Sequence, residues 1–224
     1  MIETLVIVIV LCVLALMVLP KLVHPPRRSP KIKCVNNLKN VGLAFRTFAT
    51  DNNDRFPMQI PVANGGTREF INDPTLIWMH YAALSNELST PKVLLCPSDI
   101  LGRVEAKGFN RNYRSQDSVP FSANANLSYF LGPDSSETNP NGILAGDRNI
   151  TNADKAPFSY GVARVGLLGT NHTDRAGAGW DHNVHEHAGN IALGDGSVHQ
   201  VTTSRLRNAL RSSGDPNNRI GVPD

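Results

Sequence analysis

The chain has 224 residues, of which 41% are hydrophobic and 18% are charged. This composition suits a folded domain and excludes a largely disordered chain. The net charge of +3 is too small to indicate a nucleic-acid partner, and the 18 glycines and 15 prolines favour short strands and turns over a helical bundle.

The chain begins with a strongly apolar segment. Residues 5–19, LVIVIVLCVLALMVL, carry no polar side chain except that of Cys12. With its flanks the run approaches the roughly 20 residues that cross a bilayer, so we expect residues 1–23 to form a transmembrane anchor helix. Two alternatives stay open, the core of a secretory signal peptide and a buried helix of a soluble protein. Against the signal peptide, no basic residue precedes the run and no small-x-small cleavage pattern follows it.

Residues 24–33, HPPRRSPKIK, follow as a Pro-rich basic linker with three prolines. A position next to the membrane accounts for its cluster of Lys and Arg side chains. The positive-inside tendency would place this side of the span in the cytoplasm. A head that faces the cytoplasm therefore remains an alternative to a head outside it.

The next segment, CVNNLKNVGLAFRTFAT at residues 34–50, predicts an amphipathic helix. Its apolar side chains recur in steps of three and four at Val35, Leu38, Val41, Phe45 and Phe48. We expect this helix to lie on the head and to end at the turn-forming run DNND, residues 51–54.

Short strands, turns and a last helix are predicted for the rest of the head, which spans residues 34–224. An Asp-Gly pair between two apolar stretches is a strong hairpin signal. The order of elements favours an α+β fold, with the amphipathic helix packed on an antiparallel sheet. The predicted elements are a helix over residues 74–88, strands over 92–96, 126–131 and 142–145, a turn-rich connection over 132–142, a hairpin of 190–193 and 198–202 around Gly194–Ser197, and a helix over 204–211 that stops near Gly214.

Several stretches, spread along most of the chain in a specific order, carry a family resemblance. They are CVNNLKNVGLAFRTFATDNNDRFP at residues 34–57, LLCPSD at 94–99, NLSYFLG at 126–132, ILAGDRNI at 143–150 and HEHAGNIALGDGSV at 185–198. The chain resembles bacterial type IV pilins and type II secretion pseudopilins. More narrowly, it is similar to the prepilin-type group with a C-terminal His-x9-Asp-Gly signature, which here is His185, Asn190, Asp195 and Gly196.

The resemblance implies a pilin-like fold and a structural, non-enzymatic subunit. Such a subunit would be a single-pass protein of the bacterial inner membrane, with its head in the periplasm or outside the cell. Its partners would be other pseudopilin subunits, the secretion machinery, and a prepilin peptidase if a leader precedes the helix. Glu3 falls at the position of the family's assembly glutamate, and Pro20 at that of its helix proline. A carboxylate at the edge of an apolar span needs a partner, and the amine of a neighbouring subunit would provide one; otherwise Glu3 lies in the headgroup layer.

The sequence departs from the family pattern in two respects. A basic leader does not precede Met1, so we expect that the natural chain has an upstream leader or another start. Pro25, Pro26 and Pro30 interrupt the long continuous helix that pilins usually have.

Histidines, acids and cysteines suggest two further features. His182, His185, His187 and Asp195 could bind zinc or another transition metal, and His185 and His187 would share a face if they lay in a strand. Structural anchoring by His185 is the competing interpretation, because a turn alone explains Asp195-Gly196. Calcium held by Asp147, Asp181 and Asp195 is a third, and a tethered metal-binding or hydrolytic protein is the alternative function. Cys34 and Cys96 could form a disulfide, which the sequence leaves open.

Overall fold

The computed structural model describes residues 2–4, 6–9, 13, 30–109, 119–152, 163–173 and 177–224. Its main sheet has six antiparallel strands in the order β4-β8-β1-β2-β6-β7, and β3 and β5 form a second, two-stranded sheet. The strands are β1 (Tyr129–Leu131), β2 (Ile143–Asp147), β3 (Ile150–Asn152), β4 (Arg164–Leu167), β5 (Ala178–Trp180), β6 (Ala188–Leu193), β7 (Val198–Thr202) and β8 (Arg219–Val222). The predicted α+β class with an antiparallel sheet is thus confirmed.

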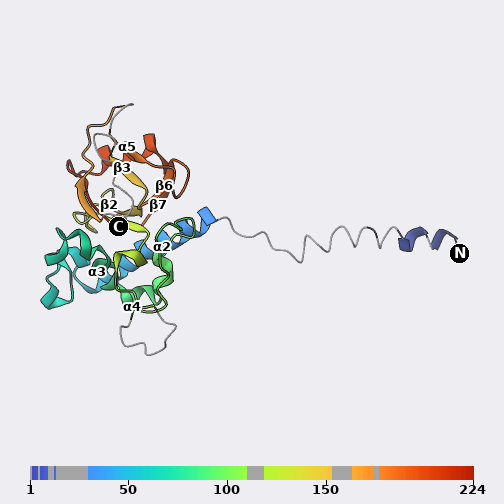
Figure 1. Ribbon diagram of the computed structural model, residues 1–224, viewed down its shortest axis with the longest axis horizontal. Helices are drawn as coiled ribbons and strands as arrows, with labels where there is room; N and C mark the ends of the chain where they lie inside the picture. Colours follow the sequence, from blue (N-terminus) through green and yellow to red (C-terminus); the bar gives the residue numbers. More distant parts are fainter. Residues whose placement is uncertain are drawn as a thin grey trace.

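Helices cover both faces of the main sheet (Figure 1). They are α2 (Pro30–Asp51), α3 (Ile77–Ala82), α4 (Ser85–Leu88) and α5 (Thr203–Ser212). Single turns of 3-10 helix lie at η1 (Pro57–Gln59), η2 (Val62–Asn64), η3 (Arg68–Phe70), η4 (Pro74–Leu76), η5 (Pro91–Leu94) and η6 (Asn124–Asn126). Helix α2 and its neighbours α3 and α4 lie on one side of the sheet, and α5 lies on the other.

The alternation of side chains along β1 separates two cores. Tyr129 and Leu131 point into the core under α2, whereas Phe130 between them belongs to the core under α5. This is the period of two expected of a strand that is buried on both faces. The same rule holds in β6, where Ala192 joins the first core and Ile191 the second.

The amphipathic helix is confirmed, and its apolar face is the one that the spacing predicts. Leu38, Val41 and Phe45 are fully buried, and the ring of Phe45 contacts Phe56 and Tyr81 edge to face. The helix ends at Asp51, after which the N–H of Asp54 bonds the carbonyl of Ala49. It begins at Pro30, inside the predicted linker, because proline suits the first turn of a helix, where its missing N–H is no loss.

The hairpin of β6 and β7 lies against α2 and has the predicted turn. Asp195 Oδ1 accepts a hydrogen bond of 2.8 Å from the N–H of Ser197, and Gly196 has a φ of +79°. A Cβ on Gly42 of α2 would lie 3.2 Å from the carbonyl oxygen of Gly196. Two glycines thus face each other and let the helix backbone approach the turn backbone closely.

Two predicted elements differ from the structure. The strand predicted over residues 92–96 is the 3-10 turn η5 followed by an extended residue, because Pro91 begins a turn that the side chain of Thr90 caps. Its apolar residues Leu94 and Cys96 are buried beside α2 and not in the sheet. The helix predicted over residues 74–88 is split into η4, α3 and α4.

Most of the predicted anchor lies outside the described residues, and so does Pro20. Residues 2–4 and 6–9 are helical, and Glu3 among them is exposed. In the part of the chain that the structure describes, no helix has the length and apolar character needed to cross a membrane.

The contact between the hairpin turn and α2 can be tested with two matched glycines. Gly65 has a φ of +83° and open space where a Cβ would be, whereas a Cβ on Gly196 would lie 2.7 Å from the Cδ of Arg46. We expect Gly65→Ala to lower the free energy of unfolding by about 1 kcal/mol, because alanine is strained in the left-handed backbone conformation. Gly196→Ala should lower the free energy of unfolding by more, about 2 kcal/mol, because it also displaces Arg46 from its ion pair with Glu137. Denaturant unfolding measures both, and equal losses would show that the turn does not bear on α2.

Candidate functional site

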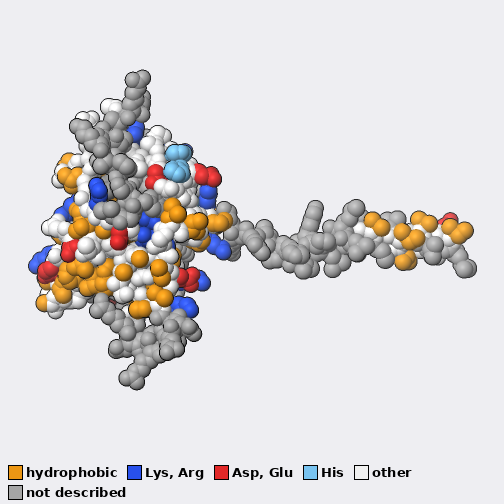
Figure 2. Space-filling model, in the orientation of Figure 1, with side chains coloured by type: hydrophobic (Ala, Val, Ile, Leu, Met, Phe, Trp, Pro, Cys, Tyr) orange, Lys and Arg blue, Asp and Glu red, His pale blue; other side chains and the backbone are white. Residues whose placement is uncertain are grey.

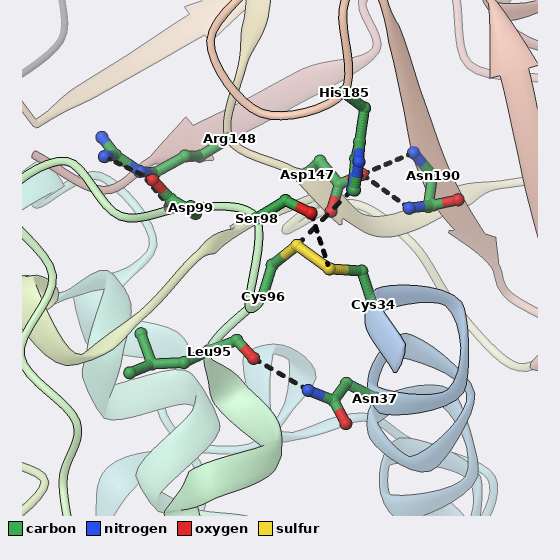
Figure 3. The surroundings of a disulfide bond; sticks show 10 residues. All are labelled: Cys34, Asn37, Leu95, Cys96, Ser98, Asp99, Asp147, Arg148, His185 and Asn190. Atoms are coloured by element: carbon green, nitrogen blue, oxygen red, sulfur yellow. Dashed lines mark hydrogen bonds and ion pairs between the residues drawn. A yellow bond between two sulfur atoms is a disulfide. The ribbon is translucent and has the colours of Figure 1, made fainter. Parts of the chain in front are cut away.

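The candidate site is a buried polar cluster where the start of α2 meets the sheet (Figure 3). A disulfide joins Cys34, in the second turn of α2, to Cys96, just beyond η5, with the two Cα atoms 4.8 Å apart. Nearby, the side-chain amide of Asn37 donates a 2.8 Å hydrogen bond to the carbonyl of Leu95. The disulfide that the sequence left open is therefore present, and it fixes the helix start to the η5 segment.

His185 reaches the same place from the turn ahead of β6. Its Nε2 lies 3.5 Å from Cys96 Sγ and 3.3 Å from Asp147 Oδ2, at the end of β2. Asn190 donates to that same carboxylate oxygen twice, from its backbone N–H at 2.7 Å and from its side-chain amide at 2.8 Å. All three side chains are buried, so Asp147 joins the signature histidine and asparagine beneath the disulfide.

Burial shifts the proton affinities of Asp147 and His185 in opposite directions. Removal from water raises the pKa of Asp147 from its ordinary 3.8 to about 7, although the hydrogen bonds from Asn190 oppose this shift. Burial, followed by the charge of Lys31, lowers the pKa of His185 below its ordinary 6.5. Between the lowered pKa of His185 and a pH of about 7, the two groups therefore hold one proton between them, and they titrate as a pair.

A second buried pair lies next to the cluster. Arg148 donates from Nε to one carboxylate oxygen of Asp99 at 2.6 Å and from a terminal nitrogen to the other at 2.9 Å. That nitrogen also donates to the carbonyl of Leu101. Both side chains are almost fully buried, and two parallel bonds of this kind are the geometry that best offsets the cost of burying two charges.

All the sequence stretches that carry the family resemblance meet at this cluster. The 34–57 stretch provides Cys34, LLCPSD provides Cys96 and Asp99, and ILAGDRNI provides Asp147 and Arg148. The signature stretch adds its histidine and asparagine, and NLSYFLG forms β1, whose Tyr129 pairs with Asp147 in register. Each of these stretches thus places at least one residue in or beside the cluster, whereas Asp195 and Gly196 of the signature lie in the hairpin turn.

The predicted metal set is not brought together. His185 is buried, whereas His182 and His187 are exposed with their ring centroids 6.3 Å apart, and Asp195 lies in the hairpin turn against Ser197. Among the described residues, the one group of three or more potential ligands is Cys34, Cys96 and His185. The calcium set is not brought together either, because Asp147, Asp181 and Asp195 form no such group among the described residues.

His185 and His187 lie ahead of β6 and not in a strand, so the condition under which they would share a face is not met. Glu186 and His187 have φ values of +55° and +61°, so the chain reverses between the two histidines before β6 begins at Ala188. This left-handed pair turns His185 inward and leaves His187 at the surface. The anchoring interpretation of His185 agrees with its contacts. Its partner Asp147 was considered only for calcium, because nothing in the local sequence pairs residues 38 positions apart.

Loss of the disulfide should weaken the head substantially. The bond closes a loop between residues 62 positions apart, for which a cross-link typically contributes about 2–4 kcal/mol. We expect the double variant Cys34→Ala with Cys96→Ala to lose this amount in urea unfolding. Cys12→Ala, which keeps the bonded pair, is the matched control and should leave head stability unchanged. A double variant as stable as the control would contradict the expectation.

Single substitutions in the proton-sharing pair should produce opposite pH dependences. Between about pH 4 and 6.5 the unfolded chain keeps one proton on His185, and the folded pair also keeps one. In the wild-type chain this pair should therefore change the stability little over that pH range. Asp147→Asn leaves only the histidine with its lowered pKa, so stability should fall as the pH drops below 6.5. His185→Gln leaves only the aspartate with its raised pKa, so stability should fall as the pH rises from 4 towards 7. For His185→Gln the change should amount to roughly 4 kcal/mol, because the pKa of Asp147 is raised from 3.8 to about 7; unfolding free energy against pH measures both profiles. Parallel profiles for the two variants would rule out the shared proton.

Comparison with known proteins adds no relative to this description. No protein-family model, curated protein or solved structure matches the chain.

Proposed function

We propose that the chain is a membrane-anchored, pseudopilin-like structural subunit of a type II secretion or type IV pilus-like assembly. The observation that carries this proposal is that the signature residues make contacts that hold α2 to the sheet. His185 and Asn190 meet Asp147 beneath the helix start, and Gly196 packs against Gly42 farther along the same helix. A subunit whose N-terminal helix connects it to an assembly needs this joint to be stiff.

The geometry of α2 agrees with such a role. Cys34 is bonded covalently to the head only four residues after the helix begins at Pro30. Lys31, ahead of it, pairs with Glu186 at 3.2 Å, although an exposed pair of this kind adds little stability. The head is therefore held close to the point at which the apolar N-terminal segment would leave it.

The N-terminal residues themselves present apolar surface. The side chains of Ile2, Val6, Ile7, Val8 and Ile9 are between 51% and 81% exposed, and Figure 2 shows apolar side chains along this segment. Apolar surface of this density calls for lipid or other apolar helices to cover it. Anchor helices of other subunits in an inner membrane, with the head in the periplasm or outside the cell, would do so.

The alternative, a tethered metal-binding or hydrolytic protein built on the His/Asp cluster, has less support. Of its four residues, His182 and His187 lie at the surface and His185 is buried. Asp195 belongs to the hairpin turn that lies against α2. The buried residue, His185, already contacts Asp147 within the head. The geometry therefore favours the structural function.

Glu3 provides the test of assembly. We expect Glu3→Gln to leave the chain in the membrane fraction but to reduce its cross-linking to neighbouring subunits at least about tenfold, because a buried amine would lose its counter-charge. Glu69→Gln is the matched control, since Glu69 is exposed on the head and its amide could still accept from Val62 N–H. Membrane fractionation and cross-linking in a bacterial host measure both steps. Unchanged cross-linking of Glu3→Gln, or a wild-type chain found free of membranes, would overturn the proposal.

A further inference from the structure

We infer that Cys34, Cys96 and His185 form a Zn²⁺ site when the disulfide is reduced. The ligand atoms of these three residues, the two Sγ atoms and an imidazole nitrogen, all lie within 4.8 Å of one another. They come from three separate segments, namely α2, the second residue after η5 and the turn ahead of β6. This site differs from the surface histidines considered above and goes beyond the proposed structural function.

Two distances around His185 Nε2, to Cys96 and to Asp147, are those of ligands on one tetrahedral ion. With zinc–sulfur bonds near 2.3 Å and zinc–nitrogen bonds near 2.0–2.1 Å, tetrahedral angles place sulfur and nitrogen about 3.5 Å apart. Cys96 Sγ lies 3.5 Å from Nε2. Only the two sulfurs must move, from bonding distance to about 3.8 Å apart, to complete the three-ligand set.

Asp147 is placed to supply a fourth ligand. Its Oδ2 lies 3.3 Å from His185 Nε2, and a tetrahedral zinc ion would separate such an oxygen and nitrogen by about 3.4 Å. Asp147 Oδ1 is also buried and has no hydrogen-bond partner within the described part of the chain. A fully buried carboxylate with an unpaired oxygen is the kind of group that a cation would stabilise.

Reduction and metal binding balance as two successive steps. A phosphine or dithiol donates two electrons to the S–S bond, which gives two thiols; a phosphine ends as its oxide with oxygen from water, and a dithiol ends as its own disulfide. Zn²⁺ then replaces the two thiol protons, which pass to solvent. Access is from a groove of about 640 Å³ that Cys96 lines together with Leu95, Pro97 and Ile100.

Thiolate and imidazole ligands favour zinc over calcium or magnesium. Calcium and magnesium prefer oxygen ligands, whereas the three ligands assigned here are two sulfurs and a nitrogen. Sulfur and nitrogen donors on a tetrahedral set select Zn²⁺ among the abundant redox-inactive ions. A bound ion would connect the same segments as the disulfide and would add His185 to the connection, so one site would have two mutually exclusive cross-links.

The experiment uses the full chain in detergent micelles, prepared oxidised or reduced with a phosphine, and mixed with ZnSO₄. After gel filtration, metal analysis should find one zinc per reduced chain and less than a tenth of that in the oxidised chain. Zinc should raise the Tm of the reduced chain but not that of the oxidised one. Co²⁺ in place of zinc should give the thiolate-to-cobalt absorption band.

Variants separate this site from the other histidines. His185→Ala should lose zinc uptake, the Tm increase and the cobalt band, whereas His182→Ala and His187→Ala should keep all three. Circular dichroism of oxidised His185→Ala verifies that this variant is folded, and Asp147→Asn is a second, milder probe that should weaken zinc binding. A reduced wild-type chain without zinc, or zinc uptake that survives His185→Ala, would overturn the inference. Because uptake needs no assembly, the result is independent of the Glu3 experiment.

Discussion

The whole head depends on the joint between the start of α2 and the sheet. One covalent bond, Cys34–Cys96, fixes the helix to the η5 segment, and the buried Asp147–His185 contact holds the β6 turn beneath it. Without this joint, α2 would be held chiefly by its apolar face, which is non-directional and tolerates sliding. The covalent and polar contacts fix the position of the start of α2. The close approach of Gly42 to the hairpin turn fixes the position of the helix farther along.

The joint also explains why so many polar groups are buried in one place. Burying Asp147 costs free energy, and its raised pKa is the measure of that cost. The cost is offset by the two donations from Asn190 and by the contact with His185. A neighbouring ion pair, Asp99 with Arg148, neutralises a second buried carboxylate. Polar contacts of this kind specify which strands and turns meet more strictly than apolar packing alone.

Local patterns in the sequence predicted the elements whose structure depends on near neighbours. The apolar spacing of Leu38, Val41 and Phe45 sufficed for α2, and Asp195-Gly196 for its hairpin turn. The strand predicted over residues 92–96 failed because its apolar side chains pack under a helix, and apolar character does not reveal which surface will cover it.

The site was less predictable than the fold because its contacts are distant in sequence. His185 was a candidate, yet its position depends on two left-handed residues, Glu186 and His187, which carry no glycine signal. The meeting of Asp147 with His185 depends on the strand order of the sheet, which the sequence alone did not establish. The stretches that carry the resemblance lie far apart in the sequence, and their order along the chain does not reveal that they converge.

The place of the disulfide has a mechanical consequence. A pull on the chain ahead of Pro30 would reach Cys34 within little more than one turn of helix. There the load would divide, and part of it would pass through the sulfur–sulfur bond into the η5 segment and the sheet. The remaining turns of α2 would be spared most of the unwinding force, so tension from an anchor would act on the folded head as a rigid body.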